Sequence, residues 1–107
     1  MTREVAFTTA AERDLRDIYD YAIEHASSER SDRLLDDLEK LCAKLVELPE
    51  RGNVPPELEA LGIIAYREVH RRPCRVIYRV LDDRLIIYAV LDARRDVRTL
   101  LERRLLR

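Results

Sequence analysis

Glycine, proline, cysteine and tryptophan are scarce in this chain of 107 residues, which contains 2 Gly, 4 Pro, 2 Cys and no Trp. So little Gly and Pro leaves little room for long flexible loops. No run approaches the roughly 20 apolar residues that a membrane-spanning helix needs, so the sequence predicts no transmembrane segment. No charged segment followed by an apolar stretch opens the chain, so we expect no secretory signal and a cytoplasmic protein.

The composition that remains is typical of one folded domain. Hydrophobic residues make up 47% of the chain and charged residues 38%, which excludes a disordered protein. The length predicts a single domain over residues 1–107. Cys42 and Cys74 are far apart and outside any metal-ligand spacing, so we expect two buried free thiols, with neither a disulfide nor a metal site.

The net charge of -1 hides two unlike halves. Residues 1–50 hold 7 Lys and Arg against 13 Asp and Glu, whereas residues 51–107 hold 13 basic residues, all Arg, against 8 acidic ones. Arginine binds carboxylates and phosphates through two parallel hydrogen bonds, so the basic half indicates an acidic partner or a polyanion. The codon bias of a GC-rich genome explains the excess of arginine equally well.

The first half predicts a short strand and two helices. A strand is expected over residues 3–7, followed by a helix that has Thr9 as its N-cap, Glu12 completing a capping box, and an end near Ala26. Ser27 and Ser28 cap a second helix, which Pro49 and Gly52 end. Its apolar stripe consists of Leu34, Leu38, Leu41, Leu45 and Leu48, and this spacing predicts core packing.

The second half predicts three strands and a final helix. Residues 49–62 are irregular, with a possible single turn over 56–60. Strands are expected over 64–70, 74–81 and 84–91, and short links make them an antiparallel meander. The tail 94–107 has a helical apolar spacing at Val97, Leu100, Leu101 and Leu105, with Arg104 inside the same sector. The predicted fold class is therefore α+β, in the order β-α-α-β-β-β, with the helix hairpin packed on an antiparallel sheet and a short C-terminal helix.

The middle strand has two chemically different faces. Val76, Tyr78 and Val80 alternate with Arg75, Ile77 and Arg79, so we expect the first set to face the helix hairpin and the second to lie on an open sheet surface. That surface is either a solvated polar face or an arginine-lined site for phosphate or carboxylate groups. The face to which Arg67 belongs depends on a register that the sequence leaves open.

Common catalytic motifs are absent from the sequence. It has no Gly-rich phosphate loop, no HExxH and no GxSxG. Neither His25 nor His70 has a Ser or Cys nucleophile at a spacing typical of a catalytic site. We therefore expect no cofactor and no metal, and these absences weigh against an enzyme.

Five segments together carry a family resemblance: FTTAAERDLRDIYDYA, LVELPERG, VPPEL, YREVHRRPCRVIYRV and IIYAVLDARRD. In this order and spacing, over residues 7–105, the chain resembles the RelE/ParE superfamily of bacterial toxins, and most of all its ParE branch. The resemblance implies a RelE/ParE-like fold and the role of toxin in a type II toxin–antitoxin module. It also implies a cognate ParD-like antitoxin that forms a hetero-oligomer with the toxin.

The two branches of the superfamily imply different targets. ParE-like members poison DNA gyrase and block replication, and RelE-like members cleave messenger RNA in the ribosome. If the chain is RelE-like, its catalytic residues would be Arg75, Arg95 (or Arg94) and Asp92. The catalytic tyrosine, expected near Leu100, and the RelE-type lysines are missing. We therefore expect a gyrase inhibitor without direct nucleic acid binding, with a ribosome-dependent mRNA endonuclease as the alternative, and an inactive toxin that only binds antitoxin as a third possibility.

The resemblance and the charge pattern together suggest two binding surfaces. The accessible basic tail is the expected target-binding region, with Arg94, Arg95, Arg98, Arg103 and Arg104. The expected antitoxin-binding residues lie on the helix hairpin and the sheet, and they are Leu15, Tyr19, Leu34, Leu38, Arg75 and Arg79. Helix-in-groove and strand-addition docking both fit an antitoxin tail.

Overall fold

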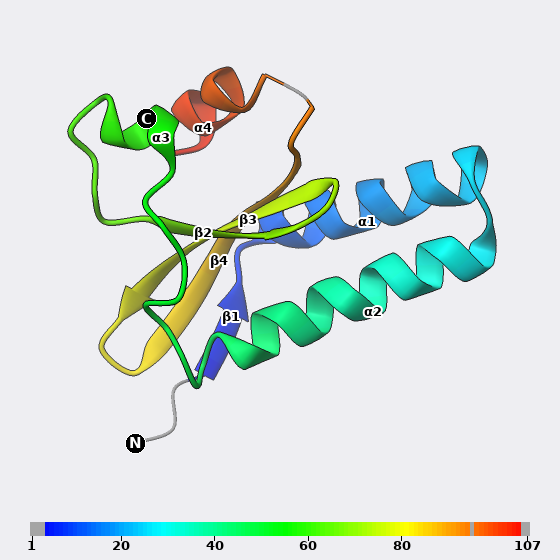
Figure 1. Cartoon of the computed structure of the whole chain (residues 1–107), viewed down its shortest axis with the longest axis horizontal. Helices are drawn as coiled ribbons and strands as arrows, with labels where there is room; N and C mark the ends of the chain where they lie inside the picture. Colours follow the sequence, from blue (N-terminus) through cyan, green and yellow to red (C-terminus); the bar gives the residue numbers. More distant parts are fainter. Residues whose placement is uncertain (1–3, 95, 106–107) are drawn as a thin grey trace.

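A computed structural model of the chain describes residues 4–94 and 96–105. It contains four strands and four helices in the order β1 (Glu4–Phe7), α1 (Thr9–His25), α2 (Ser28–Lys44), α3 (Pro56–Glu59), β2 (Arg67–Arg71), β3 (Cys74–Leu81), β4 (Arg84–Asp92) and α4 (Val97–Leu105). Figure 1 shows the hairpin of α1 and α2 on one side of the sheet, and α3 and α4 on the other. The predicted α+β fold with a helix hairpin and a short C-terminal helix is confirmed. None of the helices in the described ranges is long and apolar enough to cross a membrane.

The four strands form one sheet in the order β1-β4-β3-β2. Strands β2, β3 and β4 form the expected antiparallel meander, whereas β1 pairs with β4 in parallel, from Glu4 beside Arg84 to Phe7 beside Ile87. The short links between β2, β3 and β4 require antiparallel neighbours, but the two long helices after β1 allow its strand to run either way. This one pairing therefore differs from the all-antiparallel sheet that the sequence indicated.

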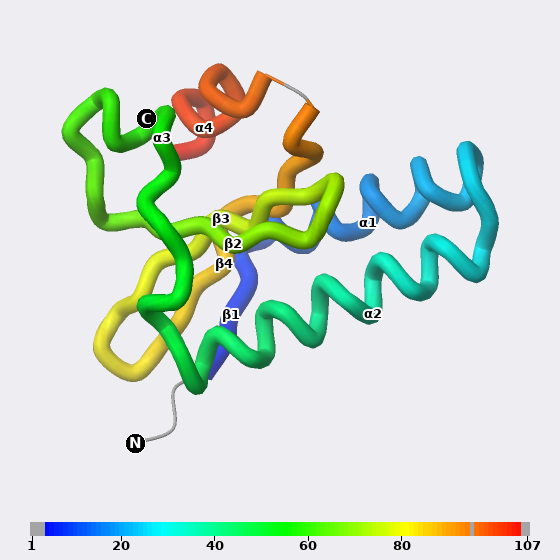
Figure 2. The backbone as a smooth tube through the Cα atoms, viewed as in Figure 1, coloured from blue at the N-terminus to red at the C-terminus, as the bar shows by residue number. Residues whose placement is uncertain are grey.

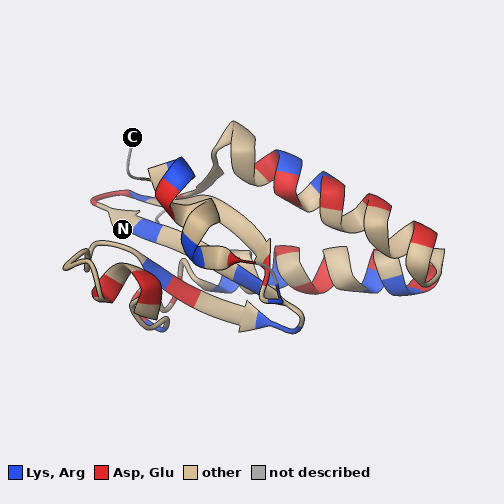
Figure 3. Ribbon diagram, turned by 90° about the horizontal axis from the view of Figure 1, so that it is seen from above, with Lys and Arg blue, Asp and Glu red and all other residues tan. Residues whose placement is uncertain are grey.

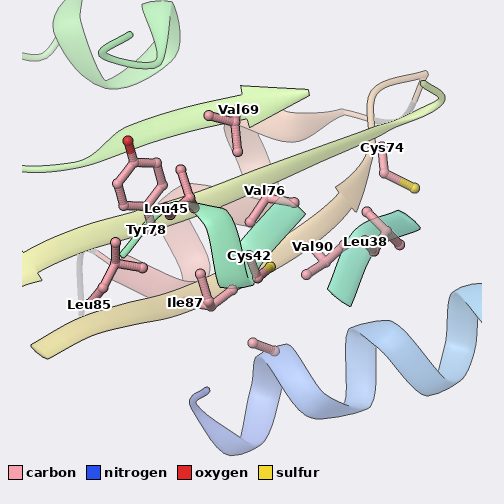
Figure 4. Close-up of a cluster of buried hydrophobic side chains, with 11 residues drawn as sticks. Leu38, Cys42, Leu45, Val69, Cys74, Val76, Tyr78, Leu85, Ile87 and Val90 are labelled. Atoms are coloured by element: carbon pink, nitrogen blue, oxygen red, sulfur yellow. The ribbon is translucent and has the colours of Figure 1, made fainter. Parts of the chain in front are cut away.

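The helix hairpin covers one face of the sheet and encloses the larger core. Val76 and Tyr78 face the hairpin as predicted, and they pack with Leu38, Cys42 and Leu45 of α2 and the turn after it (Figure 4). Both cysteines are free and buried, as predicted. Burial raises the pKa of the Cys42 thiol to about 12 and that of Cys74 to about 11.

Several element ends differ from the sequence prediction. The N-cap of α1 is Thr8 rather than Thr9, because Thr8 Oγ1 accepts a hydrogen bond from the Ala11 amide at 3.1 Å. Glu12 thus lies one position too far along the helix to complete a capping box. Ser27 caps α2 as expected.

Two apolar stretches predicted as regular structure lie outside it. Helix α2 ends at Lys44, ahead of Pro49, and Leu48 is 64% exposed rather than part of the core stripe. Strand β2 begins at Arg67 rather than at residue 64, and Ile64 is 72% exposed. In both cases the apolar pattern of the sequence continues beyond the residues that pack against the rest of the protein.

The second face of the sheet is covered, which corrects the prediction of an open surface. Helices α3 and α4 lie together over this face (Figure 2), and Leu58 of α3 shares a buried cluster with Ile77, Val97 and Leu101. Ile77 is fully buried, and Arg75 is only 9% exposed. Strand alternation shows which residues share a face but carries no information on what lies against that face.

The irregular segment between α2 and α3 is held to the sheet by hydrogen bonds. The Tyr78 hydroxyl donates to the Pro49 carbonyl at 2.8 Å and accepts from the Gly52 amide at 3.0 Å. A Cβ atom on Gly52 would lie 2.4 Å from the Glu68 carbonyl oxygen, so this close approach requires glycine. The segment is thereby fixed along the outer edge of β2. Arg67 lies opposite Tyr78 in the register, which places it on the hairpin face.

Candidate functional site

Arg75 lies at the centre of a buried cluster of charges beneath α3. Its Nε donates to Glu68 Oε1 at 2.6 Å, and its two terminal nitrogens donate to the Glu57 carboxylate at 2.7 and 2.8 Å. Glu68 is 2% exposed and also accepts from Asn53 Nδ2 at 2.9 Å. His70 Nε2 lies 3.2 Å from Glu68 Oε1. The guanidinium of Arg75 is therefore bound to carboxylates of the same chain.

The electrostatics of this cluster follow from its hydrogen bonds. The bidentate bond from Arg75 lowers the pKa of the Glu57 carboxyl, and burial opposes this only in part. The same bond to Glu57, together with the bond to Glu68, raises the pKa of Arg75 further above its ordinary value. Arg75 and Glu57 are thus both charged at neutral pH, and the two carboxylates on Arg75 occupy the positions that a bound phosphate would take.

Asp92, which was also considered for RNA cleavage, does not join Arg75. Cys74 and Asp92 face each other across β3 and β4, so they share the face opposite to that of Arg75. The Asp92 carboxylate accepts hydrogen bonds from the Arg94 amide at 2.9 Å and from its guanidinium at 3.0 and 2.7 Å. Arg95 lies outside the described residues. Among the described residues, no group of three or more His, Cys, Asp or Glu side chains could hold a metal ion.

The basic residues of the tail divide into exposed and inward-facing ones. Arg94, Arg98 and Arg103 are exposed, although Arg94 pairs with Asp92 and Arg98 pairs with Glu102 one turn further along α4. Arg104 points inward and forms an ion pair with Asp14 of α1. From the sequence alone, Arg104 is expected in the accessible basic tail. Its place within the apolar sector of the helix is the one local sign that its side chain faces inward.

The residues expected to bind an antitoxin differ in accessibility. Leu15, Tyr19 and Leu34 are half-buried, whereas Leu38 is buried in the core. Tyr19 joins the two helices of the hairpin, because its hydroxyl donates to Asp32 Oδ1 at 2.7 Å. Arg79 is half-buried on the second face of the sheet, 5.9 Å from the centre of the Tyr66 ring.

Sequence reasoning missed two groups of residues at these surfaces. Glu57 and Glu68 hold Arg75, but one lies on the short helix α3 and the other on the edge strand β2. No local pattern in the sequence links either of them to Arg75. Tyr21 and Ile23 on α1 are 56% and 43% exposed, and the Tyr21 ring stacks on His25 at 3.9 Å. A helix that buries its full apolar stripe would not leave these two side chains in solvent.

Figure 3 shows Lys or Arg and Asp or Glu interspersed along both helices of the hairpin.

Solved structures of toxin–antitoxin proteins share this fold. A chain of the chromosomal ParDE system from P. aeruginosa has a TM-score of 0.68 at 20% identity, covering 83% of this chain and 94% of that one. A chain of the RelBE2 toxin–antitoxin complex from Mycobacterium tuberculosis has a TM-score of 0.60 at 23% identity, covering 84% and 96%. A mutant of the E. coli toxin RelE in the free state has a TM-score of 0.62 at 16% identity, covering 94% and 93%. At these identities the likeness shows a common fold.

The sequence itself identifies the family. No curated protein matches the chain. The model of the ParE toxin of the type II toxin–antitoxin system parDE matches residues 5–97, which is most of the chain. The chain therefore belongs to the ParE toxin family of type II toxin–antitoxin systems.

Proposed function

We propose that this toxin inhibits DNA gyrase and that a ParD-like antitoxin neutralises it. The observation that carries the choice of target is the pairing of Arg75. Its guanidinium forms ion pairs with Glu57 and Glu68 and is therefore not available to a phosphate. Ribonucleolytic attack by a 2′-hydroxyl needs a base, an acid and a cation at the phosphate. Here the arginine that would serve the phosphate is neutralised within the chain, and Asp92 lies on the other face of the sheet.

The exposed arginines on and beside α4 are the proposed contacts with the target. Arg94, Arg98 and Arg103 are accessible, and within the described residues Arg103 forms no ion pair. Arg95 belongs to the same basic segment, outside the described residues. Arg104 is excluded from this group, because its ion pair with Asp14 holds it against α1. A basic helix surface suits an acidic patch on a protein partner.

A gyrase assay with purified toxin tests the target. We expect loss of supercoiling and trapped gyrase–DNA cleavage complexes at micromolar toxin. The double variant Arg98→Glu with Arg103→Glu should lose this effect by about tenfold, because it reverses two exposed charges at the proposed contact. Arg84→Glu, an equally exposed arginine at the start of β4, serves as the matched control. If wild-type toxin leaves both gyrase activities unchanged, the target is wrong.

Transcript mapping tests the endonuclease alternative in the same cells. Primer extension on transcripts from cells that express the toxin should show no new 5′ ends positioned by codon. New ends of this kind would replace the gyrase proposal with the RelE-type activity. Normal growth on induction, with antitoxin binding retained, would instead identify an inactive toxin.

The antitoxin proposal rests on the family and on the accessible hairpin. Leu15, Tyr19 and Leu34 are half-buried, and Tyr21 and Ile23 add exposed apolar surface to the same hairpin. Such a surface fits an amphipathic segment. Co-purification with the product of the adjacent gene should give a complex, and removal of that protein's C-terminal tail should abolish it. A tight complex with the truncated partner would contradict this docking.

A further inference from the structure

Arg79 on β3 is a half-buried arginine that has no hydrogen-bond acceptor within the described residues. Four other arginines of the described chain are buried or half-buried, and they are Arg67, Arg71, Arg75 and Arg104. Each of these four donates to a carboxylate or to backbone carbonyls. Arg79 forms neither a hydrogen bond nor an ion pair with any residue that the structure describes, and its guanidinium carbon lies over the Tyr66 ring, 5.9 Å from the ring centre.

The register of the sheet explains why Arg79 has no acidic neighbour. It lies opposite Ile86 of β4, and the residues two positions away on β3 are Ile77 and Leu81. These positions share one face of the sheet with Arg79. On the β2 side its neighbour is Tyr66, the residue before the strand. The positive charge is therefore surrounded by uncharged side chains.

Arg79, Tyr66 and Tyr88 form a partly open cluster, which we call the Arg79 site. Helices α3 and α4 cover the first part of this face, whereas the last three residues of β3 are only half-buried. Tyr66 and Tyr88 are also half-buried and meet edge to face, with 5.3 Å between their ring centres. Arginine and tyrosine are among the residue types that contribute most to affinity at protein interfaces.

The turn after α3 fixes the loop that carries Tyr66. The Gly62 amide donates to the Glu59 carbonyl and the Ile63 amide to the Leu58 carbonyl, both at 2.9 Å. This pair of bonds ends the helix with Gly62 at a φ of 77°, in the left-handed region. Ile63 and Tyr66 then pack against the same buried cluster. The ring beneath the guanidinium is thus in position before a partner binds, which lowers the entropic cost of binding.

We propose that the Arg79 site binds an acidic side chain of the target protein, an inference that rests on the proposed function and adds a second contact to it. A carboxylate would accept from the terminal nitrogens of Arg79, as the Glu57 carboxylate does from those of Arg75. Ile64, in the same loop as Tyr66, is 72% exposed. Apolar surface beside an unpaired cation fits a protein surface better than a nucleic acid.

The position of the Arg79 site favours the target over the antitoxin. The helix hairpin, on which the antitoxin is proposed to dock, lies on the other side of the sheet (Figure 1). Tyr66 packs against the same buried cluster as Leu100 and Leu105 of α4, and α4 carries the exposed arginines of the proposed target contact. The Arg79 site would extend that contact from α4 onto the sheet.

The affinity of purified toxin for the gyrase holoenzyme, measured without DNA by biolayer interferometry, tests the proposal. Arg79→Gln should weaken binding by at least about tenfold. Arg79→Lys keeps the charge without the paired donors, so it should recover only part of the affinity. Arg72→Gln, an exposed arginine in the turn between β2 and β3, should bind as wild type does.

Stability separates a binding role from a structural one. Since Arg79 forms no hydrogen bond or ion pair within the described ranges, Arg79→Gln should match wild type in urea denaturation. A variant that loses stability together with affinity would overturn the proposal, because the arginine would then act through the fold.

The outcomes also separate the Arg79 site from the proposed target. If wild-type toxin and Arg79→Gln bind gyrase equally well, the site is wrong and the target stands. Weaker binding only when DNA is present would assign Arg79 to a phosphate, and weaker binding only to the antitoxin would assign it to that protein. Either result would overturn the proposal.

Growth arrest in cells decides about the site if wild-type toxin does not bind gyrase and the proposed target fails. An Arg79→Gln variant that arrests growth as wild type does would then contradict the site. Loss of growth arrest, with stability and antitoxin binding unchanged, would retain the site as a contact with a different target protein.

Discussion

The surroundings of a single residue, Arg75, decide what its guanidinium can do. Arginine at this position could bind a phosphate, a partner's carboxylate or the protein's own acidic groups, because the same pair of parallel hydrogen bonds serves all three. Here Glu57 takes both terminal nitrogens and Glu68 takes Nε. Removal of one partner from a buried charge cluster leaves an uncompensated charge, so we expect the loss of Glu57 or Glu68 alone to destabilise the fold.

The pH dependence of stability tests the role of Glu57. Its pKa is below its ordinary value of 4.5 because it accepts from Arg75, so its stabilising effect is present at neutral pH and is lost as the pH falls through the lowered pKa of the folded state. We expect Glu57→Gln to lower the free energy of unfolding at pH 7 by about 1–3 kcal/mol. The difference from wild type should shrink on acidification. Urea denaturation at several pH values measures it.

The control for this prediction is on the same short helix. Glu59→Gln removes an exposed carboxylate that forms no ion pair within the described residues, so its stability should follow that of wild type at every pH. A Glu57→Gln curve that runs parallel to wild type down to acidic pH would contradict the stabilising role of the pair.

Helix α4 is an element too short to be stable alone. Nine residues give a marginal helix in water, so α4 depends on the burial of Val97 and Leu101 against the sheet and on the ion pair between Arg104 and Asp14. At its start, Asp96 accepts hydrogen bonds from the Thr99 amide at 3.1 Å and from the Thr99 hydroxyl at 2.7 Å. These bonds lower the pKa of the Asp96 carboxyl.

Loss of the Asp96 cap should loosen α4. The Asp96→Ala variant leaves the Thr99 amide without its acceptor, so we expect faster amide exchange at Leu101 and greater susceptibility of α4 to proteolysis. Asp96→Asn keeps a capping oxygen and should stay close to wild type. Equal exchange rates at Leu101 in the Ala variant and wild type would show that packing alone holds the helix.

The bounds of a helix or strand could be predicted from the sequence where nearby residues set them. Strand β3 has the predicted bounds, because the alternating run CRVIYRVL lies between turn-forming residues. Helix α2 ends earlier than Pro49 indicated, since a proline sets the latest possible end of a helix and tertiary packing sets the actual one. The parallel pairing of β1 had no local signal, because its partner is about 80 residues away.

At the scale of the whole molecule, the unlike charges of the two halves serve partly to join them. Arg71 on β2 binds Asp37 on α2 at 2.8 Å, and Arg104 on α4 binds Asp14 on α1. Both pairs connect an acidic residue before residue 50 with an arginine after it. Part of the arginine excess is therefore satisfied within the chain, and the exposed remainder is available to partners.

The shared core predicts cooperative unfolding of the entire chain. The larger core contains residues of β1, the hairpin and all three later strands, so neither half can keep its packing when the other unfolds. Urea transitions followed by far-UV circular dichroism, which reports mainly on the helices, and by amide hydrogen exchange of the buried β3 residues Val76 and Tyr78 should coincide. Two separate transitions would show that the hairpin and the sheet unfold independently.

Residue types and their local order determined the element sequence, the face of β3 that meets the hairpin, the burial of both cysteines and the family of the chain. Periodicity, capping residues and turn residues act over a few positions, so they can be read without coordinates. Only the tertiary structure decided that α3 and α4 cover the second face of the sheet. It also decided that Arg75 forms ion pairs with Glu57 and Glu68, and that Asp14 and Arg104 lie against the edge of β4. These contacts join residues from 7 to 90 positions apart, and their formation depends on how the elements pack together.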